Sequence, residues 1–460
     1  MIELTTEKMA AAMGAEVVSR GHGGVPARAE IDSRKIEGGE LFFGLTSGAG
    51  DGGEHAAGAF DAGAWGVVVT PDRAGELADS GGFVFAVEDP LLALQMLARA
   101  WRRELGATVI GVTGSVGKTS VKDITRALLP GAVHASAENF NTEIGLPITV
   151  LEAPSGTETL VLEMAMRGKG QIAELAMIAE PDIGVITNVG PVHVELLGSI
   201  EAVAAAKAEL IKAVTPDGTM VVPFAAGHLE PHLDRVPGLV RFGGEGDVRT
   251  GSVETLAGAT RARIITPQGE QDFDFPFAEP HNLVNALAAI AVGVTAGFAP
   301  AELASKTGSI AFSRFRNEHI DLGDKGLIIN DCYNANPVSM RAALEYLAGI
   351  DRPRKLAVLG LMGELGPDEV RFHEEIGALA RQLGIEVIGV GDLARSYDPE
   401  LKAGNPEEAA RLLAERLGPE TVALVKGSRA AGLERVTELV TAGHVTTGSR
   451  SAANGDGSAA

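Results

Sequence analysis

The stretch Val112–Ser120 reads VTGSVGKTS and has the glycine-rich composition and Lys-Thr ending of a phosphate-binding loop. A β-branched run precedes it, and the helix-forming segment KTSVKDITRALL overlaps its end. Backbone N–H groups between a strand and the start of a helix can bind phosphate oxygens. We expect Lys118 to neutralise the β- and γ-phosphates of a nucleotide and the Thr119 hydroxyl to bind Mg²⁺. The alternative is an ordinary strand-to-helix turn, since Val112 replaces the first glycine of the strict G-x-x-x-x-G-K pattern.

Length and charge narrow the class of protein. A chain of 460 residues exceeds what one hydrophobic core usually supports, which predicts two to four domains. The 39 Lys and Arg against 61 Asp and Glu give a net charge of −22, which disfavours a nucleic-acid or anionic-membrane surface. The single cysteine, Cys332, excludes an intrachain disulfide. The start of the chain lacks a signal-peptide pattern and the apolar stretch Ala286–Ala299 is too short to cross a bilayer, so we predict a cytoplasmic protein.

The spacing of apolar runs predicts an α/β protein with three domains. Short β-branched runs alternate with helical segments, which is typical of parallel sheets covered by helices. We expect a small N-terminal α/β unit at 1–106, a central phosphate-loop domain with a mainly parallel sheet at 107–314, and a doubly wound, Rossmann-like domain at 315–445. A Gly, Ser and Ala tail at 446–460 is expected to be disordered. The expected strands are Gly66–Val69, Phe83–Val87, Thr108–Val112, Thr159–Leu162, Ile183–Ile186, Leu327–Ile329, Leu356–Leu359, Val387–Val390 and Val422–Val425.

Polar side chains follow two strands of the expected central sheet. Glu163 ends the run TLVLE, and His193 comes just after DIGVITNVGP. Ligands collect outside the carboxyl ends of strands in such sheets, so Thr119, Glu163 and His193 can converge on one Mg²⁺. The alternatives are a solvated glutamate and a hydrogen-bonded structural histidine.

Lys207 lies on an apolar helical face. In SIEAVAAAKAELIKAV we expect one helix whose face holds Ile200, Val203, Ala204, Leu210, Ile211 and Val214, and position 207 falls on that face. A buried lysine must be paired, extend its ammonium to water, or lose its charge. The neutral form can add CO₂ and become a carbamate, an anion able to bind Mg²⁺. A lysine that only reaches to solvent is the alternative.

A second glycine pattern, in the expected C-terminal domain, indicates a structural turn and not a nucleotide-binding site. Gly389, Gly391 and Ala394 match the G-x-G-x-x-A dinucleotide fingerprint after a strand. No strand-ending acidic residue follows about 20 residues later, as ribose binding requires. We therefore expect a glycine turn.

Ten motifs occur in the order found in Mur ligases, and the chain resembles that family from about residue 30 to 440. The motif YNANP and the motif KGSR favour the branch that adds a dipeptide, because the D-N-P-R signature of the branch that adds the third residue is absent. The motifs are TGSVGKTS, NFNTEIGLP, LEMAMRGKGQI, TNVGPVHVELLGS, AAAKAEL, HNLVNALAA, SRFR, NDCYNANPVSM, VLGLMGELG and LVKGSRAAGLERV.

The resemblance implies a role for each domain and for named residues. The N-terminal domain would bind a UDP-sugar, the central domain ATP, and the C-terminal domain would close over the site. The catalytic residues would be Lys118, Glu163, His193 and Lys207, the last carbamylated, with Thr119, Glu163, His193 and Lys207 holding Mg²⁺. ATP would be bound by Gly114, Ser115, Val116, Gly117, Lys118, Thr119, Ser120, Asn282, Asn285, Arg314 and Asp331. The other substrates would contact Asp32, Ser33, Arg34, Asn141, Thr142, Tyr333, Asn334 and Asn336.

The implied activity is ATP-dependent amide ligation. The expected partners are UDP-N-acetylmuramoyl-tripeptide and D-alanyl-D-alanine, which the enzyme would join through an acyl phosphate in peptidoglycan precursor synthesis. We expect the protein to be a monomer. A folylpolyglutamate-type ligase or another peptidoglycan ligase is the alternative with the same reaction. A nucleotide-dependent switch is the alternative from another class, although the sequence holds no N-K-x-D guanine motif.

Overall fold

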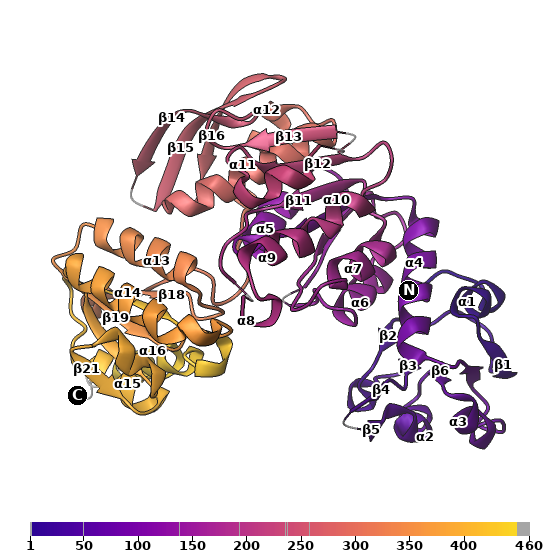
Figure 1. Cartoon of the computed structure of the whole chain (residues 1–460). Helices are drawn as coiled ribbons and strands as arrows, with labels where there is room; N and C mark the ends of the chain where they lie inside the picture. Colours follow the sequence, from indigo (N-terminus) through magenta and orange to yellow (C-terminus); the bar gives the residue numbers. More distant parts are fainter. Residues whose placement is uncertain are drawn as a thin grey trace, which may run out of the picture. The chain divides into compact units, whose positions relative to one another are not determined.

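The computed structural model describes residues 2–48, 50–137, 139–192, 194–234, 236, 238–256 and 258–448 (Figure 1). Contacts divide the described chain into two compact units. Unit 1 holds the residues up to Val189, Ala204–Ala278 and Leu283–Ala311. Unit 2 holds Gly190–Val203, Glu279–Asn282 and the residues from Phe312 onward. Unit 1 contains both the N-terminal and the central sheet, and the last segment of unit 2 begins at Phe312. The domain boundaries expected after residues 106 and 314 stay predictions.

The N-terminal sheet of unit 1 has the order β1-β7-β6-β3-β2, antiparallel between β1 and β7 and parallel elsewhere. Its apolar strands bury Phe42, Val67 and Val84 against α2 and α3. The strands are β1 (Glu16–Ser19), β2 (Ala29–Glu30), β3 (Leu41–Phe43), β6 (Gly66–Val69) and β7 (Phe83–Ala86), beside the small pair β4 (Thr46–Ser47) and β5 (Gly50–Asp51). The helices are α1 (Thr6–Met13), α2 (Ala56–Asp61) and α3 (Pro71–Glu76).

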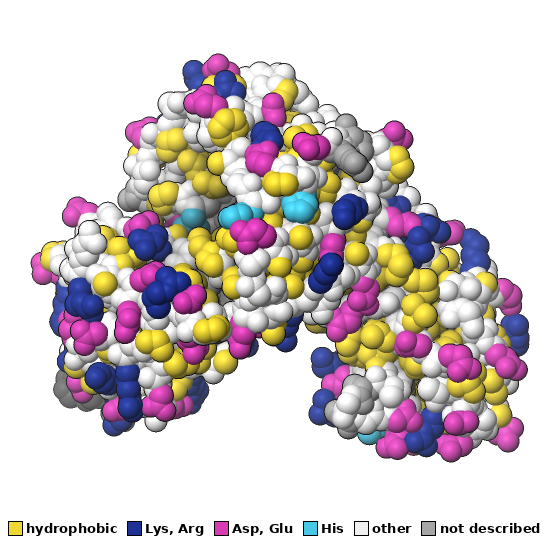
Figure 2. Space-filling model, in the orientation of Figure 1, with side chains coloured by type: hydrophobic (Ala, Val, Ile, Leu, Met, Phe, Trp, Pro, Cys, Tyr) yellow, Lys and Arg dark blue, Asp and Glu magenta, His cyan; other side chains and the backbone are white. Residues whose placement is uncertain are grey.

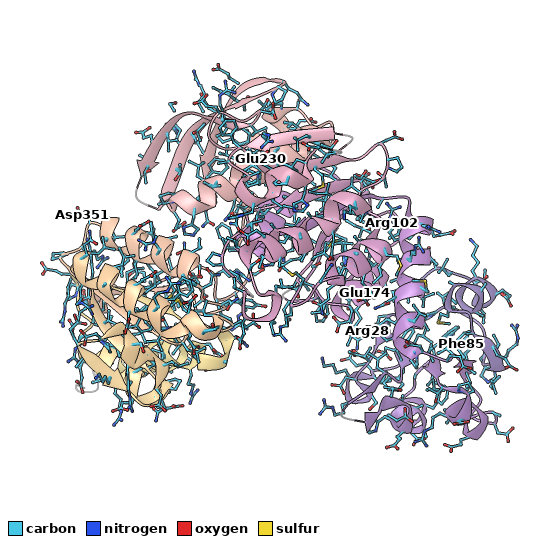
Figure 3. All side chains as sticks on the ribbon, in the orientation of Figure 1. Arg28, Phe85, Arg102, Glu174, Glu230 and Asp351 are labelled. Atoms are coloured by element: carbon cyan, nitrogen blue, oxygen red, sulfur yellow. The ribbon has the colours of Figure 1, made fainter. Side chains whose placement is uncertain are left out.

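Helix α4 (Pro90–Leu105) joins this sheet to the rest of unit 1. Asp89 caps its start by accepting from the N–H groups of Leu91 and Leu92, and the helix ends at Gly106, whose φ is +62°. Gln95 donates to Glu174 at 2.8 Å, and the Arg102 guanidinium donates to two carbonyls at the end of α7 (Gln171–Ala179). Figure 3 labels Arg102 and Glu174 on these two helices. The α4–α7 contact thus attaches the N-terminal sheet to the central one.

The central sheet of unit 1 is parallel throughout, with the order β13-β12-β11-β8-β10-β9. Its middle strands are buried on both faces, as expected for a parallel sheet covered by helices. The strands are β8 (Thr108–Thr113), β9 (Val133–Ala135), β10 (Thr159–Glu163), β11 (Ile183–Ile186), β12 (Thr219–Pro223) and β13 (Gly238–Phe242). The helices that come between these strands along the chain are α5 (Lys118–Leu128), α6 (Gly145–Glu152), α7, α8 (Val194–Leu197), α9 (Ile200–Lys207) and α10 (Glu209–Ala213), of which α8 and the first half of α9 belong to unit 2. The carboxyl ends of β8, β10 and β11 therefore meet at one edge.

A smaller antiparallel sheet, β14-β15-β16, follows in unit 1, and α12 packs against β16. The elements are β14 (Arg249–Leu256), β15 (Ala259–Thr266), β16 (Gly269–Phe275), α11 (Pro280–Thr295) and α12 (Pro300–Ala304).

The sheet of unit 2 has the order β17-β18-β22-β19-β20-β21 and is parallel except for the pair β17 and β18. Separate apolar clusters cover its two faces, one with α13 and α14 and the other with α15 and α16, which makes it doubly wound. The strands are β17 (Glu318–Asp321), β18 (Leu327–Asn330), β19 (Arg354–Leu359), β20 (Glu386–Val390), β21 (Leu401–Ala403) and β22 (Thr421–Lys426). The helices are α13 (Pro337–Gly349), α14 (Glu369–Gln382), α15 (Pro406–Ala414) and α16 (Glu434–Gly448).

The predicted α/β fold with two parallel-rich sheets is confirmed. The expected tail at 446–460 is partly wrong, because α16 extends to Gly448, and residues 449–460 lie outside the described residues. The expected glycine turn is present at Gly391, with φ of +85°, followed by a short 3-10 helix, Leu393–Tyr397. Basic and acidic side chains are interspersed on the face shown in Figure 2. Among the described residues, no helix has the length and apolar character that a membrane crossing requires.

Candidate active site

The loop Gly114–Ser120 connects β8 to α5 and depends on two glycines. Gly114 has φ of +152°, and a Cβ there would overlap the Thr187 hydroxyl. Gly117 has φ of +82°, and a Cβ there would lie 2.5 Å from Asn285 Oδ1. Gly117 directly precedes α5, so Lys118 and Thr119 form the first turn of an 11-residue helix. The backbone N–H groups of that turn are the donors that phosphate oxygens use.

The end of β11 shapes this loop. Asn188 Oδ1 accepts hydrogen bonds from the N–H groups of Ser115 at 3.1 Å and Val116 at 2.9 Å. The Thr187 hydroxyl donates to the Val116 carbonyl at 2.5 Å, and Lys118 Nζ donates to the Gly114 carbonyl at 2.9 Å. We did not predict Asn188 or Thr187, although TN follows β11 at the same edge as Glu163 and could have indicated them.

Thr119, Glu163 and Asn141 meet at the carboxyl end of β10. The Thr119 hydroxyl donates to Glu163 Oε2 at 2.8 Å, and Asn141 Nδ2 donates to Glu163 Oε1 at 2.9 Å. Thr119 and Glu163 are 3% and 2% exposed, so the carboxylate is held by neutral donors away from bulk water. The predicted proximity of Thr119 and Glu163 is therefore present. Thr142 lies next to Asn141 and accepts from the Gly145 N–H at the start of α6.

A buried ammonium lies behind Glu163. The Glu163 N–H donates to Ser136 Oγ at 3.1 Å, and Lys122 Nζ donates to the Ser136 carbonyl at 2.8 Å. Lys122 also pairs with Asp123 at 2.9 Å, and both side chains are almost fully buried. We did not predict this layer, although Lys122 is one helical turn after Lys118 and so lies on the same side of α5.

Lys207 is buried, as predicted, at 2% exposure. Burial, together with the nearby charge of Lys118, lowers the pKa of its ammonium well below the usual range. The prediction of one continuous helix around it was wrong, because α9 ends at Lys207 and α10 begins at Glu209. The Glu209 carboxylate accepts from the N–H groups of Gly170 and Ala173 at the start of α7, which draws α10 toward that helix.

Magnesium ligands are available at this edge. His193, the third expected ligand, lies outside the described residues. Within the described ranges no group of three His, Cys, Asp or Glu side chains could hold a metal ion. The buried Glu163 carboxylate and Thr119 hydroxyl nevertheless supply the hard oxygen donors that Mg²⁺ prefers, beside a phosphate loop. These residues fit a nucleotide-bound Mg²⁺.

The predicted substrate residues of the N-terminal sheet are paired with each other. Arg34 donates from Nε and Nη2 to the two oxygens of Asp32, each at 2.8 Å, and Ser33 lies between them in a 3-10 turn. The hydrogen bonds from Arg34 lower the pKa of Asp32 to about 2. The ion pair between Arg34 and Asp32 therefore orders this turn at the protein surface.

In unit 2, Asp331 pairs with a buried lysine. Lys426 Nζ, 2% exposed, contacts Asp331 Oδ2 at 2.5 Å and donates to the Asn334 carbonyl at 3.1 Å. Asn336 caps α13 by accepting from the Ser339 N–H, so its side chain holds the helix start. We did not predict Lys426, although a charge at the end of the buried run TVALVK is the same signal that indicated Glu163.

Asn282 lies in a second polar cluster of unit 2. Asn282 Nδ2 donates to Glu279 Oε2 at 3.2 Å, and His319 Nε2 lies 3.2 Å from Glu279 Oε1. Although burial raises the pKa of Glu279, hydrogen bonds from His319 and Asn317 hold it at about 2. The Asn282 amide is therefore oriented by a carboxylate that stays ionised.

Comparison with known proteins gives the family. The description "Mur ligase middle domain" matches residues 112–293, and "Mur ligase, glutamate ligase domain" matches residues 315–429. The UDP-N-acetylmuramoyl-tripeptide–D-alanyl-D-alanine ligase of Bacillus subtilis is 40% identical over 354 residues, 76% of each chain. The chain belongs to the Mur ligase family. The ligase of the same name from Mycobacterium tuberculosis is 36% identical and covers 96% of this Mur ligase and 98% of its own length.

A solved structure agrees with this assignment. The MurF ligase of Thermotoga maritima, in complex with ADP, superposes with a TM-score of 0.80 at 31% identity, covering 94% of this chain and 99% of its own. This Mur ligase is an ATP-dependent ligase. The phosphate loop, Glu163 and Lys207 fall in its middle-domain match, and Asp331, Tyr333 and Lys426 in its C-terminal match.

Proposed function

We propose that this Mur ligase joins D-alanyl-D-alanine to UDP-N-acetylmuramoyl-tripeptide in peptidoglycan precursor synthesis. The observation that carries the proposal is the arrangement at the edge of the central sheet. There the phosphate loop begins α5, the Thr119 hydroxyl lies 2.8 Å from the buried Glu163, and Lys207 is buried near the charge of Lys118. The printed names of relatives that cover most of the chain support the choice of substrates.

The chemistry explains why a phosphate loop is needed. A carboxylate cannot form an amide directly, because oxide would have to leave. Its oxygen therefore attacks the γ-phosphorus of ATP, the bond to the bridging oxygen breaks, and ADP departs from an acyl phosphate. The dipeptide amine then attacks the acyl carbon and loses a proton, and inorganic phosphate leaves as the amide forms.

The protein positions these groups and balances their charge. Lys118 and the N–H groups of the first turn of α5 would hold the phosphates, where fixed donors stabilise the charge that develops during transfer. Mg²⁺ bound through Thr119, Glu163 and His193 would supply charge neutralisation at the β- and γ-phosphates. Asn141, hydrogen-bonded to Glu163, would extend this edge toward the muramoyl-peptide.

We also propose that Lys207 works as a carbamate. Burial disfavours its ammonium, and no acidic side chain among the described residues pairs with it. The neutral amine adds to CO₂ and releases a proton, which leaves an anion with two oxygens suited to Mg²⁺.

The family resemblance suggests the remaining contacts. Asp32, Ser33 and Arg34 would bind the UDP part, Asn282 and Asn285 would face adenine, and Arg314 and Asp331 would also contact the nucleotide. Tyr333, Asn334 and Asn336 would lie near the dipeptide.

Phosphate release tests the proposal. We expect phosphate release only when ATP, UDP-N-acetylmuramoyl-tripeptide and D-alanyl-D-alanine are all present. Release with a folate substrate and glutamate would indicate the folylpolyglutamate-type alternative. Release without any amine would indicate an ATPase that works as a switch.

A further inference from the structure

The carboxylate of Glu279 connects three separate segments of unit 2. Glu279 directly precedes α11, and only 2% of the residue is exposed. His319 of β17 has its Nε2 3.2 Å from Glu279 Oε1, and the Asn317 side chain donates a further hydrogen bond to the carboxylate. Burial and the nearby Glu279 charge also raise the pKa of the Tyr346 hydroxyl on α13, so that hydroxyl stays protonated. These contacts fix the position of a buried, ionised carboxylate at the start of α11.

The same carboxylate determines which way the Asn282 amide is turned. Asn282 lies in the first turn of α11, where its Nδ2 donates to Glu279 Oε2 at 3.2 Å and its backbone N–H donates to the Glu279 carbonyl at 3.0 Å. An ionised carboxylate can only accept hydrogen bonds. If the amide turned over, its oxygen would face the carboxylate and be repelled by it. The nitrogen of the amide is therefore held toward Glu279, and the oxygen is held away from it.

A fixed amide can distinguish between purine bases. An asparagine side chain can pair with the N6–N7 edge of adenine, because its oxygen accepts from the 6-amino group. An amide oxygen has two lone pairs and can accept more than one hydrogen bond. A 6-oxopurine such as guanine or hypoxanthine carries an acceptor oxygen in place of the amino group, so two acceptors would face each other.

We propose that Glu279 is a positioning residue that makes the nucleotide site select adenine over 6-oxopurines by fixing the orientation of Asn282. This inference rests on the proposed function, in which Asn282 faces adenine, and adds the residue that gives this contact its direction. A purely structural role for Glu279 would affect the binding of every nucleotide alike. The ratio of the affinities for two bases therefore separates the two roles.

The test compares the Kd values for ADP and inosine diphosphate, measured by calorimetry in the presence of Mg²⁺. Inosine diphosphate carries a carbonyl oxygen in place of the 6-amino group. We expect the wild type to prefer ADP by about 10- to 100-fold, the range for replacing one buried hydrogen bond by two unpaired acceptors. Glu279→Gln should bring the ratio to near one, because a glutamine amide can also donate to the Asn282 oxygen and so permits either orientation.

Two further variants check that Glu279 acts through Asn282. Glu279→Asp should keep a preference for ADP even if both nucleotides bind more weakly, since its carboxylate still only accepts hydrogen bonds. Asn282→Ala should itself bring the ratio to near one, and adding Glu279→Gln to it should change the ratio no further, because residues that act as one unit are not additive.

Glu386→Gln is the matched control. Glu386 is another partly buried carboxylate of unit 2, at the start of β20, and accepts from Arg416 at 3.0 Å and Arg354 at 3.1 Å. This variant should keep the full preference for ADP. Equal binding of the two nucleotides by the wild type, or a full preference in folded Glu279→Gln, would overturn the proposal. No phosphate release by the wild type with all three ligation substrates would instead refute the proposed function, since binding of ADP needs neither of the other two.

Discussion

Replacing Lys122 with methionine should destabilise unit 1 strongly, because its buried ammonium pairs with a buried carboxylate. Lys122 is 3% exposed and pairs with Asp123, which is 7% exposed. The substitution removes the ammonium that pairs with a buried carboxylate, and breaking a buried ion pair typically costs about 3–5 kcal/mol. The exposed Arg371–Glu375 pair gives the contrast, since such pairs contribute only about 0–1 kcal/mol.

The loss should reach the nucleotide site. Lys122 holds the Ser136 carbonyl, and Ser136 Oγ holds the backbone N–H of Glu163. Without Lys122 this layer can shift, and Glu163 loses part of its fixed position beside Thr119. We therefore expect weaker ADP binding in the presence of Mg²⁺ as well as lower stability.

Differential scanning calorimetry can measure the effect, using the transition that Mg²⁺ and ADP stabilise to identify unit 1. A domain of about 150–250 residues loses about 2–4 °C per kcal/mol, and unit 1 is somewhat larger, so the transition should fall by roughly 4 °C or more. Lys122→Met with Asp123→Leu should recover most of the loss, because both charges leave together. Arg371→Met is the control and should stay within about 2 °C of the wild type. A Lys122→Met transition that also stays within that range, or a double variant no better than the single one, would refute the reasoning.

Four other predictions follow, three from the candidate site and one from His373, a buried histidine of α14. Lys118→Ala should reduce phosphate release on the order of 10³-fold while the protein stays folded, and near wild-type release would exclude its role at the phosphates. Asn188→Ala removes the side-chain oxygen that accepts from the Val116 N–H, whereas the Ser115 N–H keeps the Asn188 carbonyl, so the Kd for ADP should rise about 10-fold, measured by calorimetry. Lys207→Ala should lose most activity and regain part of it with acetate, whereas full activity of Lys207→Arg would show that no carbamate is needed. Burial lowers the pKa of His373 below its ordinary 6.5, so the unfolded chain binds the proton more readily and stability should fall as the pH drops below that value; His373→Gln should flatten this dependence.

Those residues of the candidate site could be predicted from the sequence whose neighbours in the chain form a recognisable pattern. Glu163 ends a run of apolar residues, and such a run predicts a buried parallel strand with its last side chain at the ligand edge. Lys207 was found in the same way, because a lysine on an apolar helical face conflicts with the cost of burying charge. The loop Gly114–Ser120 carries its own composition signal.

The helix break at Ala208 could not be predicted from the periodic spacing of apolar residues. The apolar spacing continues through this position, yet α9 ends at Lys207 and α10 begins at Glu209, whose carboxylate accepts from two N–H groups at the start of α7, a helix distant in sequence. No local propensity encodes that hydrogen bond.

The sequence by itself determined the α/β fold, the phosphate loop and the family, because periodicity, strand-end charges and ordered motifs are properties of short segments. Only the tertiary structure decided which residues support them. Asn188 reaches the loop from the next strand, Lys122 reaches Glu163 through Ser136, and Glu279 meets His319 from a separate segment. Each of these contacts joins residues whose spacing along the chain carries no signal, since the sheet order and the backbone path set which side chains meet.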